Sequence, residues 1–215
     1  MPRNSDLTTG DAADRELAKG LFGERFSLVD EYVSLLRSQG VLRGLIGPRE
    51  VDRIWSRHIL NSVASYQLFP TGARVADVGS GAGLPGIPLA IIRPDLDFTL
   101  IESMLRRTTF LEEVVTALGL DSQVNVLRAR AEEVPGVFDV VTARAVAPLE
   151  KLLNWTSGLF LPDGELLALK GESATDEVAA AKEFLARKKL VAETLSVRAL
   201  PQTELTYVIR VRAAR

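Results

Sequence analysis

The sequence predicts an α/β fold, with a seven-stranded and mostly parallel sheet that follows a helical extension. From Ala73 onward, seven apolar segments are separated mostly by stretches of helical spacing: 73–78, 97–102, 123–127, 138–143, 165–170, 191–200 and 205–211. Only a short turn around Pro201 separates the last two, so we expect them to pair as an antiparallel hairpin. Residues 1–69 are expected to form a tail and helical extension, and residues 70–215 the main domain, together in one structural unit.

Two helices are predicted in the extension. Apolar residues recur at helical spacing from Phe26 to Leu36, behind Ser27 as the cap, and Gly40 ends this helix. A second helix covers residues 51–63. Both tryptophans of the chain, at positions 55 and 155, occupy apolar helical positions, so we expect them in the core rather than stacked on a base.

Prolines and glycines mark the helices of the main domain. Pro85 and Pro88 fall in the first turn of the helix after the first strand, where missing N–H groups cost little. Ser103 is predicted to cap the next helix, which ends at Gly119. Pro148 opens another helix. These positions support alternating strands and helices.

Composition excludes several classes of site. The chain has 215 residues, of which 47% are hydrophobic and 25% charged, and it contains no cysteine, so neither a disulfide framework nor a cysteine nucleophile is possible. The net charge of −2 is uneven: residues 1–69 carry 0, residues 70–181 carry −7 and residues 182–215 carry +5. Because the amino terminus is polar and no apolar run reaches membrane-spanning length, we expect a cytoplasmic protein without membrane contact.

A glycine-rich loop follows the first strand. Asp77 precedes Gly79, Gly81 and Gly83, and such a loop lets the backbone approach a nucleotide cofactor closely. The G-x-G-x-x-G spacing from Gly81 to Gly86 also fits dinucleotide enzymes, although that spacing alone is weak evidence. An acid at the strand end can accept hydrogen bonds from the ammonium of a methionine moiety, directly or through water, but would repel a pyrophosphate. The pattern therefore favours S-adenosylmethionine over a dinucleotide.

Several segments resemble one known family. DVGSGAGLPGIPLAII, preceded by SRHILNS and followed by TLIES, RAEEV, FDVVTARAVAPL and LLALKG, is similar to the bacterial small-subunit ribosomal RNA guanine-N7 methyltransferases, the glucose-inhibited division protein B family. The resemblance covers roughly residues 20–210 and implies a Rossmann-like class I methyltransferase fold with S-adenosylmethionine as cofactor. One position departs from it, because Asn61 stands where the family commonly has an Asp.

The resemblance implies a donor site at the carboxyl ends of the strands. Glycine backbone would approach the methionine half of the donor, Leu84 would pack on it, and Glu102 would accept the ribose hydroxyls. Ala131 and Glu132 would contact the adenine. The expected cofactor-binding residues are Asp77, Gly79, Gly81, Gly83, Leu84, Glu102, Ala131, Glu132 and Arg144.

Arg144 follows the fourth strand, where it could face both donor and acceptor, although an ion pair with Asp139 or Glu150 is the alternative. The strand lacks the Asn/Asp-Pro-Pro-aromatic run typical of amine methylation. Guanine N7 has a free lone pair and needs no general base, so we expect catalysis by positioning, without a proton-transferring residue or a metal ion.

The implied acceptor is 16S ribosomal RNA in the small ribosomal subunit or its precursor. The residues expected to bind RNA are Arg53, Arg57, His58, Arg106 and Lys170, although solvated or structural roles are open for them. A monomer is expected. Two other functions stay open: a methyltransferase acting on a small molecule or another RNA, and a module or dehydrogenase that binds a dinucleotide.

Overall fold

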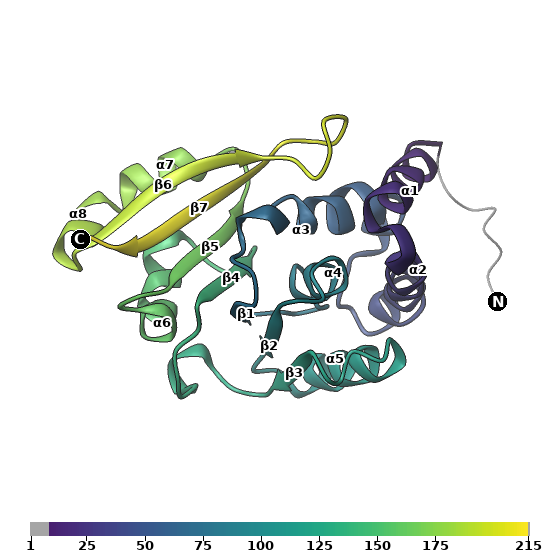
Figure 1. The fold of residues 1–215 in the computed structure, drawn as a ribbon, viewed down its shortest axis with the longest axis horizontal. Coiled ribbons are helices and arrows are strands. Elements are labelled where there is room, and N and C mark those ends of the chain that lie inside the picture. Colours follow the sequence, from purple (N-terminus) through teal and green to yellow (C-terminus); the bar gives the residue numbers. More distant parts are fainter. Residues whose placement is uncertain (1–8, 215) are drawn as a thin grey trace.

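The computed structural model describes residues 9–214, so most of the predicted amino-terminal tail lies outside the described residues. Its centre is a seven-stranded sheet with the order β3-β2-β1-β4-β5-β7-β6 (Figure 1). Strands β1 to β5 are parallel, whereas β7 runs antiparallel to both β5 and β6. The strands are β1 (Arg74–Val78), β2 (Asp97–Ile101), β3 (Val124–Leu127), β4 (Val140–Arg144), β5 (Glu165–Lys170), β6 (Leu190–Val197) and β7 (Thr206–Ala213). The predicted sheet and its antiparallel hairpin are confirmed.

Helices cover both faces of the sheet (Figure 1). One layer holds α1 (Thr9–Phe22), α2 (Phe26–Leu35), α3 (Asn61–Val63), α4 (Gly86–Ile92) and α5 (Leu105–Ala117). The other holds α6 (Leu149–Phe160), α7 (Ala174–Ala180) and α8 (Lys182–Arg187). Shorter helical turns include the 3-10 helix Pro48–Arg53 and the π-helical segment Ile54–Leu60. In the described part of the chain, no helix is long and apolar enough to cross a membrane.

Alternate strand residues build two cores. Val75 and Leu167 pack toward the layer of α4 and α5, whereas Ala76 and Leu166 pack toward α6 to α8. The first core is continuous with the helical extension, because the fully buried Trp55 belongs to it. The expected core position of Trp55 is thus confirmed, and the extension packs on the sheet through shared apolar surface.

Some helix boundaries differ from the predicted ones. Residues 9–22 form α1, a helix that was not predicted, and α2 begins at Phe26 without a side-chain cap from Ser27. Ser103 does not cap α5 either, because Met104 occupies the cap position and its N–H donates to the Glu102 carboxylate at 2.9 Å. The start after Pro148 is confirmed.

The sheet has a topological switch point between β1 and β4. The chain leaves β1 toward β2 on one side, and it leaves β4 toward β5 on the other. In open α/β sheets, ligands bind in the crevice outside the carboxyl ends of strands at such a point. Gly79 follows β1 and Arg144 ends β4, so the fold brings these two predicted site residues to the crevice.

Candidate active site

The loop after β1 is held in a shape that only glycine accommodates at its first position. The Gly79 N–H donates to the Ile101 carbonyl at 2.8 Å, and the Ser80 hydroxyl donates to the Asp77 carbonyl at 2.8 Å. Gly79 has φ +69°, and a Cβ there would lie 2.9 Å from Cγ2 of Val146. The backbone can therefore border an open site without a side chain in the way.

Asp77 lies beneath this loop. Its side chain is fully buried, and Oδ2 accepts the Gly86 N–H at the start of α4 at 3.1 Å, while Oδ1 has no partner within residues 9–214. Burial, the largest effect, raises the pKa of Asp77 to about 7. Among the described residues that line the cavities below, Asp77 does not occur. In this structure Asp77 holds the start of α4 through Gly86 and does not line these three cavities, and its contact with the donor stays a prediction.

The helical extension supports the same loop from below. The hydroxyl of Tyr32, in α2, donates to the Ala82 carbonyl at 2.8 Å. Gly83 has φ +98°, and a Cβ there would lie 2.7 Å from Cγ1 of Ile87 and 3.1 Å from the Tyr32 hydroxyl. Gly83 therefore permits close packing between the loop and the extension instead of lining a cavity.

A cavity of about 260 Å³, here called the β2 cavity, opens beside the loop. Glu102 enters it from the end of β2, where Oε2 accepts the Gly81 N–H at 3.1 Å and also lies 3.4 Å from Nη1 of Arg107. The carboxylate thus ties the loop to β2 and presents acceptor oxygens to the cavity. The residues that line the β2 cavity are Val78, Gly79, Ile101, Glu102, Ser103, Ala129, Arg130, Ala131, Glu132 and Trp155.

Trp155 follows the core expectation only in part, because it packs against the core beneath α6 to α8 without being fully buried. It is only partly buried, it lines the β2 cavity, and Nζ of Lys151 lies 5.0 Å from the centre of its ring. Ala131 and Glu132, for which the resemblance implies contact with the adenine, line the same cavity. The indole adds apolar surface to a cavity that is also lined by Glu102 and Glu132.

A second cavity of about 260 Å³, the loop cavity, lies on the other side of Gly79. It contains the loop residues 79–82 and Leu84, together with Glu50, His58, Arg144 and Ala145. Gly79 lines both this cavity and the β2 cavity, so one elongated ligand could extend past its backbone into both. Predicted residues Gly81 and Leu84 therefore border the site, together with Gly79.

A larger cavity of about 700 Å³, the basic cavity, adjoins the loop cavity. Both are lined by Glu50, His58, Arg144 and Ala145, and the basic cavity also contains Arg53, Arg57 and Lys170. Ala145 has φ +55°, an uncommon conformation for a residue with a side chain. Non-glycine residues in this conformation cluster at functional sites. Ala145 stands where the two cavities meet.

Arg144 makes no ion pair with Asp139, which instead pairs with Arg74 at 3.3 Å. Nη1 of Arg144 donates to the Arg57 carbonyl at 3.1 Å and to Oδ1 of Asn61 at 3.3 Å. Nη2 lies 3.2 Å from Nδ1 of His58. Burial lowers the pKa of this guanidinium, but it stays charged because an arginine does not deprotonate in a protein.

The residues expected to bind RNA are not all equivalent. Arg53, Arg57, His58 and Lys170 line the basic cavity, whereas Arg106 is exposed in the first turn of α5, outside that lining. The ammonium group of Lys170 already has two partners within the protein. Its Nζ lies 2.6 Å from the Glu177 carboxylate and donates to the Ala147 carbonyl at 2.7 Å. Arg57 lies 3.1 Å from Glu50, but its side chain is half exposed, so its guanidinium remains accessible to a ligand.

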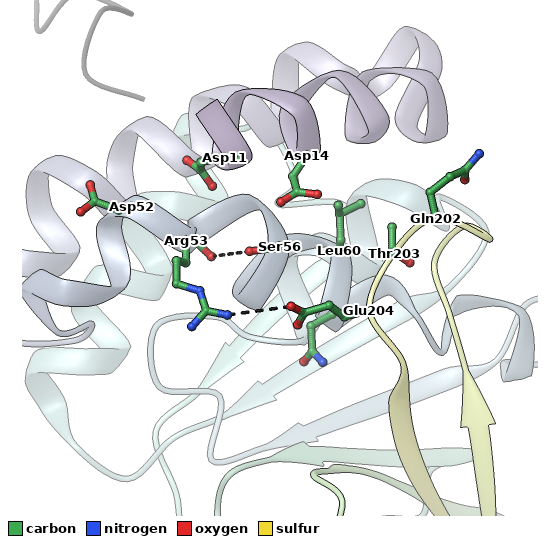
Figure 2. Close-up of a pocket in the computed structure, with 11 residues that line it drawn as sticks. Asp11, Asp14, Asp52, Arg53, Ser56, Leu60, Gln202, Thr203 and Glu204 are labelled. Atoms are coloured by element: carbon green, nitrogen blue, oxygen red, sulfur yellow. Dashed lines mark hydrogen bonds and ion pairs between the residues drawn. The ribbon is translucent and has the colours of Figure 1, made fainter. Parts of the chain in front are cut away.

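A further hollow of about 270 Å³ adjoins the basic cavity (Figure 2). Asp11 and Asp14 of α1 face the helical segment 52–60 across it, and the connection between β6 and β7 closes it with Glu204, 3.9 Å from Arg53. Burial raises the pKa of Asp14, and the nearby Glu204 adds to that effect. Acidic side chains make this hollow unsuitable for a polyanion.

Several residues at the site were not identified from the sequence. Glu50 precedes Arg57 and His58 by two helical turns, a spacing that could have placed all three on one helix face. Tyr32 and Glu177 reach the site only through long-range packing, so the sequence carries no local signal for them. Within residues 9–214, no group of three or more His, Asp or Glu side chains could hold a metal ion.

Comparison with known proteins shows similarity over most of the chain. A family model described as rRNA small subunit methyltransferase G matches residues 25–206. A protein of that name from Streptomyces coelicolor is 55% identical over 185 residues, which cover 85% of this chain and 76% of the relative. Another, from Thermobifida fusca, is 51% identical over 199 residues, or 91% and 84%.

The fold is also shared with solved methyltransferases. The crystal structure of a SAM dependent methyltransferase from Aquifex aeolicus matches with a TM-score of 0.54 and 16% sequence identity, covering 83% of this chain and 95% of that one. At this identity the similarity concerns the fold alone. The predicted Rossmann-like class I architecture is thereby confirmed.

Proposed function

This chain belongs to the rRNA small subunit methyltransferase G family, and from that premise we propose that it methylates N7 of a guanine at one site in 16S ribosomal RNA. It is an S-adenosylmethionine-dependent methyltransferase, so the dinucleotide-binding alternative is wrong. The observation that carries the proposal is the shared wall of the loop cavity and the basic cavity at Arg144 and Ala145. A donor in the loop cavity and a base in the basic cavity would therefore meet beside these residues.

The residues present fit the donor. Gly79 has no side chain and lines both the β2 cavity and the loop cavity. The two cavities together offer room for an elongated ligand such as a nucleoside joined to an amino acid. Glu102 offers carboxylate oxygens for ribose hydroxyls, and Ala131, Glu132 and Trp155 surround the remaining space of the β2 cavity. S-Adenosylmethionine, when bound, supplies a methyl group activated by its sulfonium.

The basic cavity fits a nucleotide of a polyanion. Its accessible cations Arg53 and Arg57 can contact phosphates, and Arg144 can donate to an oxygen acceptor on the base. Guanine presents O6 and N7 on one edge, and arginine commonly donates to both. Methylation at N7 requires that its lone pair stays free, so we infer that Arg144 donates to O6 alone.

No proton has to be removed from N7, so the task of the chain is alignment. Holding two reactants at near-attack distance can contribute roughly 7–11 kcal/mol in favourable intramolecular models. Glu50, at the same wall, can stabilise the positive charge that remains on a methylated guanine. We assign no general base.

We further propose that the substrate is the small ribosomal subunit or its precursor, in which the target base lies in an exposed, unpaired segment. Such a particle is found in the cytoplasm, where we expect the chain to act as a monomer. Size-exclusion chromatography with light scattering measures the oligomeric state, and a stable dimer would contradict this part of the proposal.

The test is transfer of labelled methyl groups from S-adenosylmethionine to small subunits purified from cells that lack this protein, with mass spectrometry of the digested RNA. We expect 7-methylguanosine at one site. Glu102→Ala should weaken donor binding and transfer, while Glu112→Ala, an exposed acid on α5, is the matched control. Label in another nucleoside would overturn the N7 assignment, and label in metabolites alone would favour the small-molecule alternative.

A further inference from the structure

We propose that His58 and Asn61 are positioning residues that act through Arg144, holding its guanidinium at the wall between the loop cavity and the basic cavity. The inference deepens the proposed function, on which it rests, by assigning a task to two side chains beside the acceptor. It concerns a hydrogen-bond network that joins the helical extension, β4 and β7.

The guanidinium is anchored from one direction only. An arginine has five N–H donors. The Arg57 carbonyl and Oδ1 of Asn61 take both donors of Nη1, at 3.1 Å and 3.3 Å, and Nδ1 of His58 takes one of Nη2, at 3.2 Å. All three acceptors come from residues 57–61, at the end of the π-helical segment. The donors that remain, Nε–H and the second Nη2–H, are those available to a ligand.

The contact with Arg144 sets the state of His58. A guanidinium can only donate, so Nδ1 must accept, and the neutral ring then carries its proton on Nε2. Nε2 lies 3.2 Å from Oε2 of Glu50 but outside hydrogen-bond geometry, so the hydrogen bond that orients the ring is the one with Arg144. Burial and the Arg144 charge lower the pKa of His58 to about 4, against the opposing effect of Glu50. The ring is therefore a neutral acceptor at physiological pH.

Asn61 is fixed in the same way. Its Nδ2 donates to Oγ1 of the buried Thr206 on β7 at 2.8 Å, which turns Oδ1 toward Arg144. Both supporting side chains are uncharged, and so is the Arg57 carbonyl. Arg144 is thus held in place while its positive charge is not neutralised by the groups that hold it. A charge kept in this way is available to an electron-rich acceptor such as guanine O6 or a phosphate.

The test is a double-mutant cycle on single-turnover methyl transfer to small subunits. We expect His58→Leu and Asn61→Leu each to lower the rate roughly 10- to 100-fold, the effect of removing a hydrogen bond to a charged group. His58→Asn places an oxygen acceptor where Nδ1 lies, and Asn61→Gln keeps an uncharged amide oxygen, so both should restore most of the rate. In an Arg144→Met background, the leucine substitutions should have little further effect, because their target is gone.

Thermal unfolding and donor affinity are measured for each variant. Equal losses with and without Arg144 would overturn the inference, because they indicate a role independent of the guanidinium, and so would an unchanged rate in folded His58→Leu. If His58→Leu fails to fold, the partly exposed Asn61 carries the same comparison through its Leu and Gln variants. Absence of transfer by the wild-type chain would instead refute the proposed function itself.

Discussion

Replacing Asp77 by Asn should stabilise the protein, and more so as the pH rises. The folded state raises the pKa of Asp77 from 3.8 to about 7, so between these values the folded chain binds a proton that the unfolded chain has lost. Raising the pH through this range therefore lowers the free energy of unfolding of the wild-type chain. Each pKa unit corresponds to about 1.4 kcal/mol, so the free energy of unfolding of the wild type is about 4 kcal/mol lower above pH 7 than it is below pH 3.8.

The Asn variant keeps an oxygen acceptor for the Gly86 N–H but has no carboxyl group to titrate. From the same two pKa values, we expect the variant to gain about 2 kcal/mol at pH 5 and about 4 kcal/mol at pH 8.5. Any hydrogen-bond difference that does not depend on pH cancels between the two conditions.

Urea unfolding at both pH values measures the difference, and Asp163→Asn, an exposed acid in the turn before β5, controls for loss of a charge. The reasoning is refuted if the gap between wild type and the Asp77 variant is the same at pH 5 and pH 8.5. A change in this gap in favour of wild type between pH 5 and pH 8.5 would refute it more strongly, because the buried carboxylate would then be favourable.

Four other substitutions have defined outcomes. Gly79→Ala should lower the free energy of unfolding in urea by about 1–2 kcal/mol, because its Cβ meets Val146 in a left-handed conformation; no loss would contradict the contact. Ala145→Gly should raise that free energy by about 1 kcal/mol by relieving φ +55°. Tyr32→Phe should lower it by about 1 kcal/mol through one lost hydrogen bond. Glu102→Ala should raise the donor Kd roughly 10- to 100-fold in calorimetry, whereas an unchanged Kd would exclude donor contact.

The parts of the fold with strong local signals could be predicted from the sequence. Glycines and prolines after β1 constrain the backbone whatever packs around them, so this loop and the start of α4 were predicted correctly. Helix α1 was missed because its apolar stripe is short: Ala18 and Phe22 enter the core, and Leu17 and Leu21 pack against it. The first half of the helix is largely charged or small, so its stability depends on this packing.

The candidate site shows the same division. Strand ends identified Glu102 and Arg144, since β-strands of a parallel sheet bring their carboxyl ends to one edge. The direction of Asp77 could not be predicted, because β1 is buried on both faces and its sequence therefore has no alternating pattern. Lys170 was expected to meet RNA, but its pairing with Glu177 depends on how α7 packs, which no local pattern encodes.

The wall shared by the loop cavity and the basic cavity has a thermodynamic consequence. Because Glu50, His58, Arg144 and Ala145 border both spaces, a ligand that orders these side chains would lower the entropic cost of binding the other ligand. Linkage makes such an effect reciprocal: the factor by which ribosomal RNA tightens the donor must equal the factor by which the donor tightens RNA. After methyl transfer, dissociation of either product should lower the affinity of the protein for the other product, so the two products should be released cooperatively.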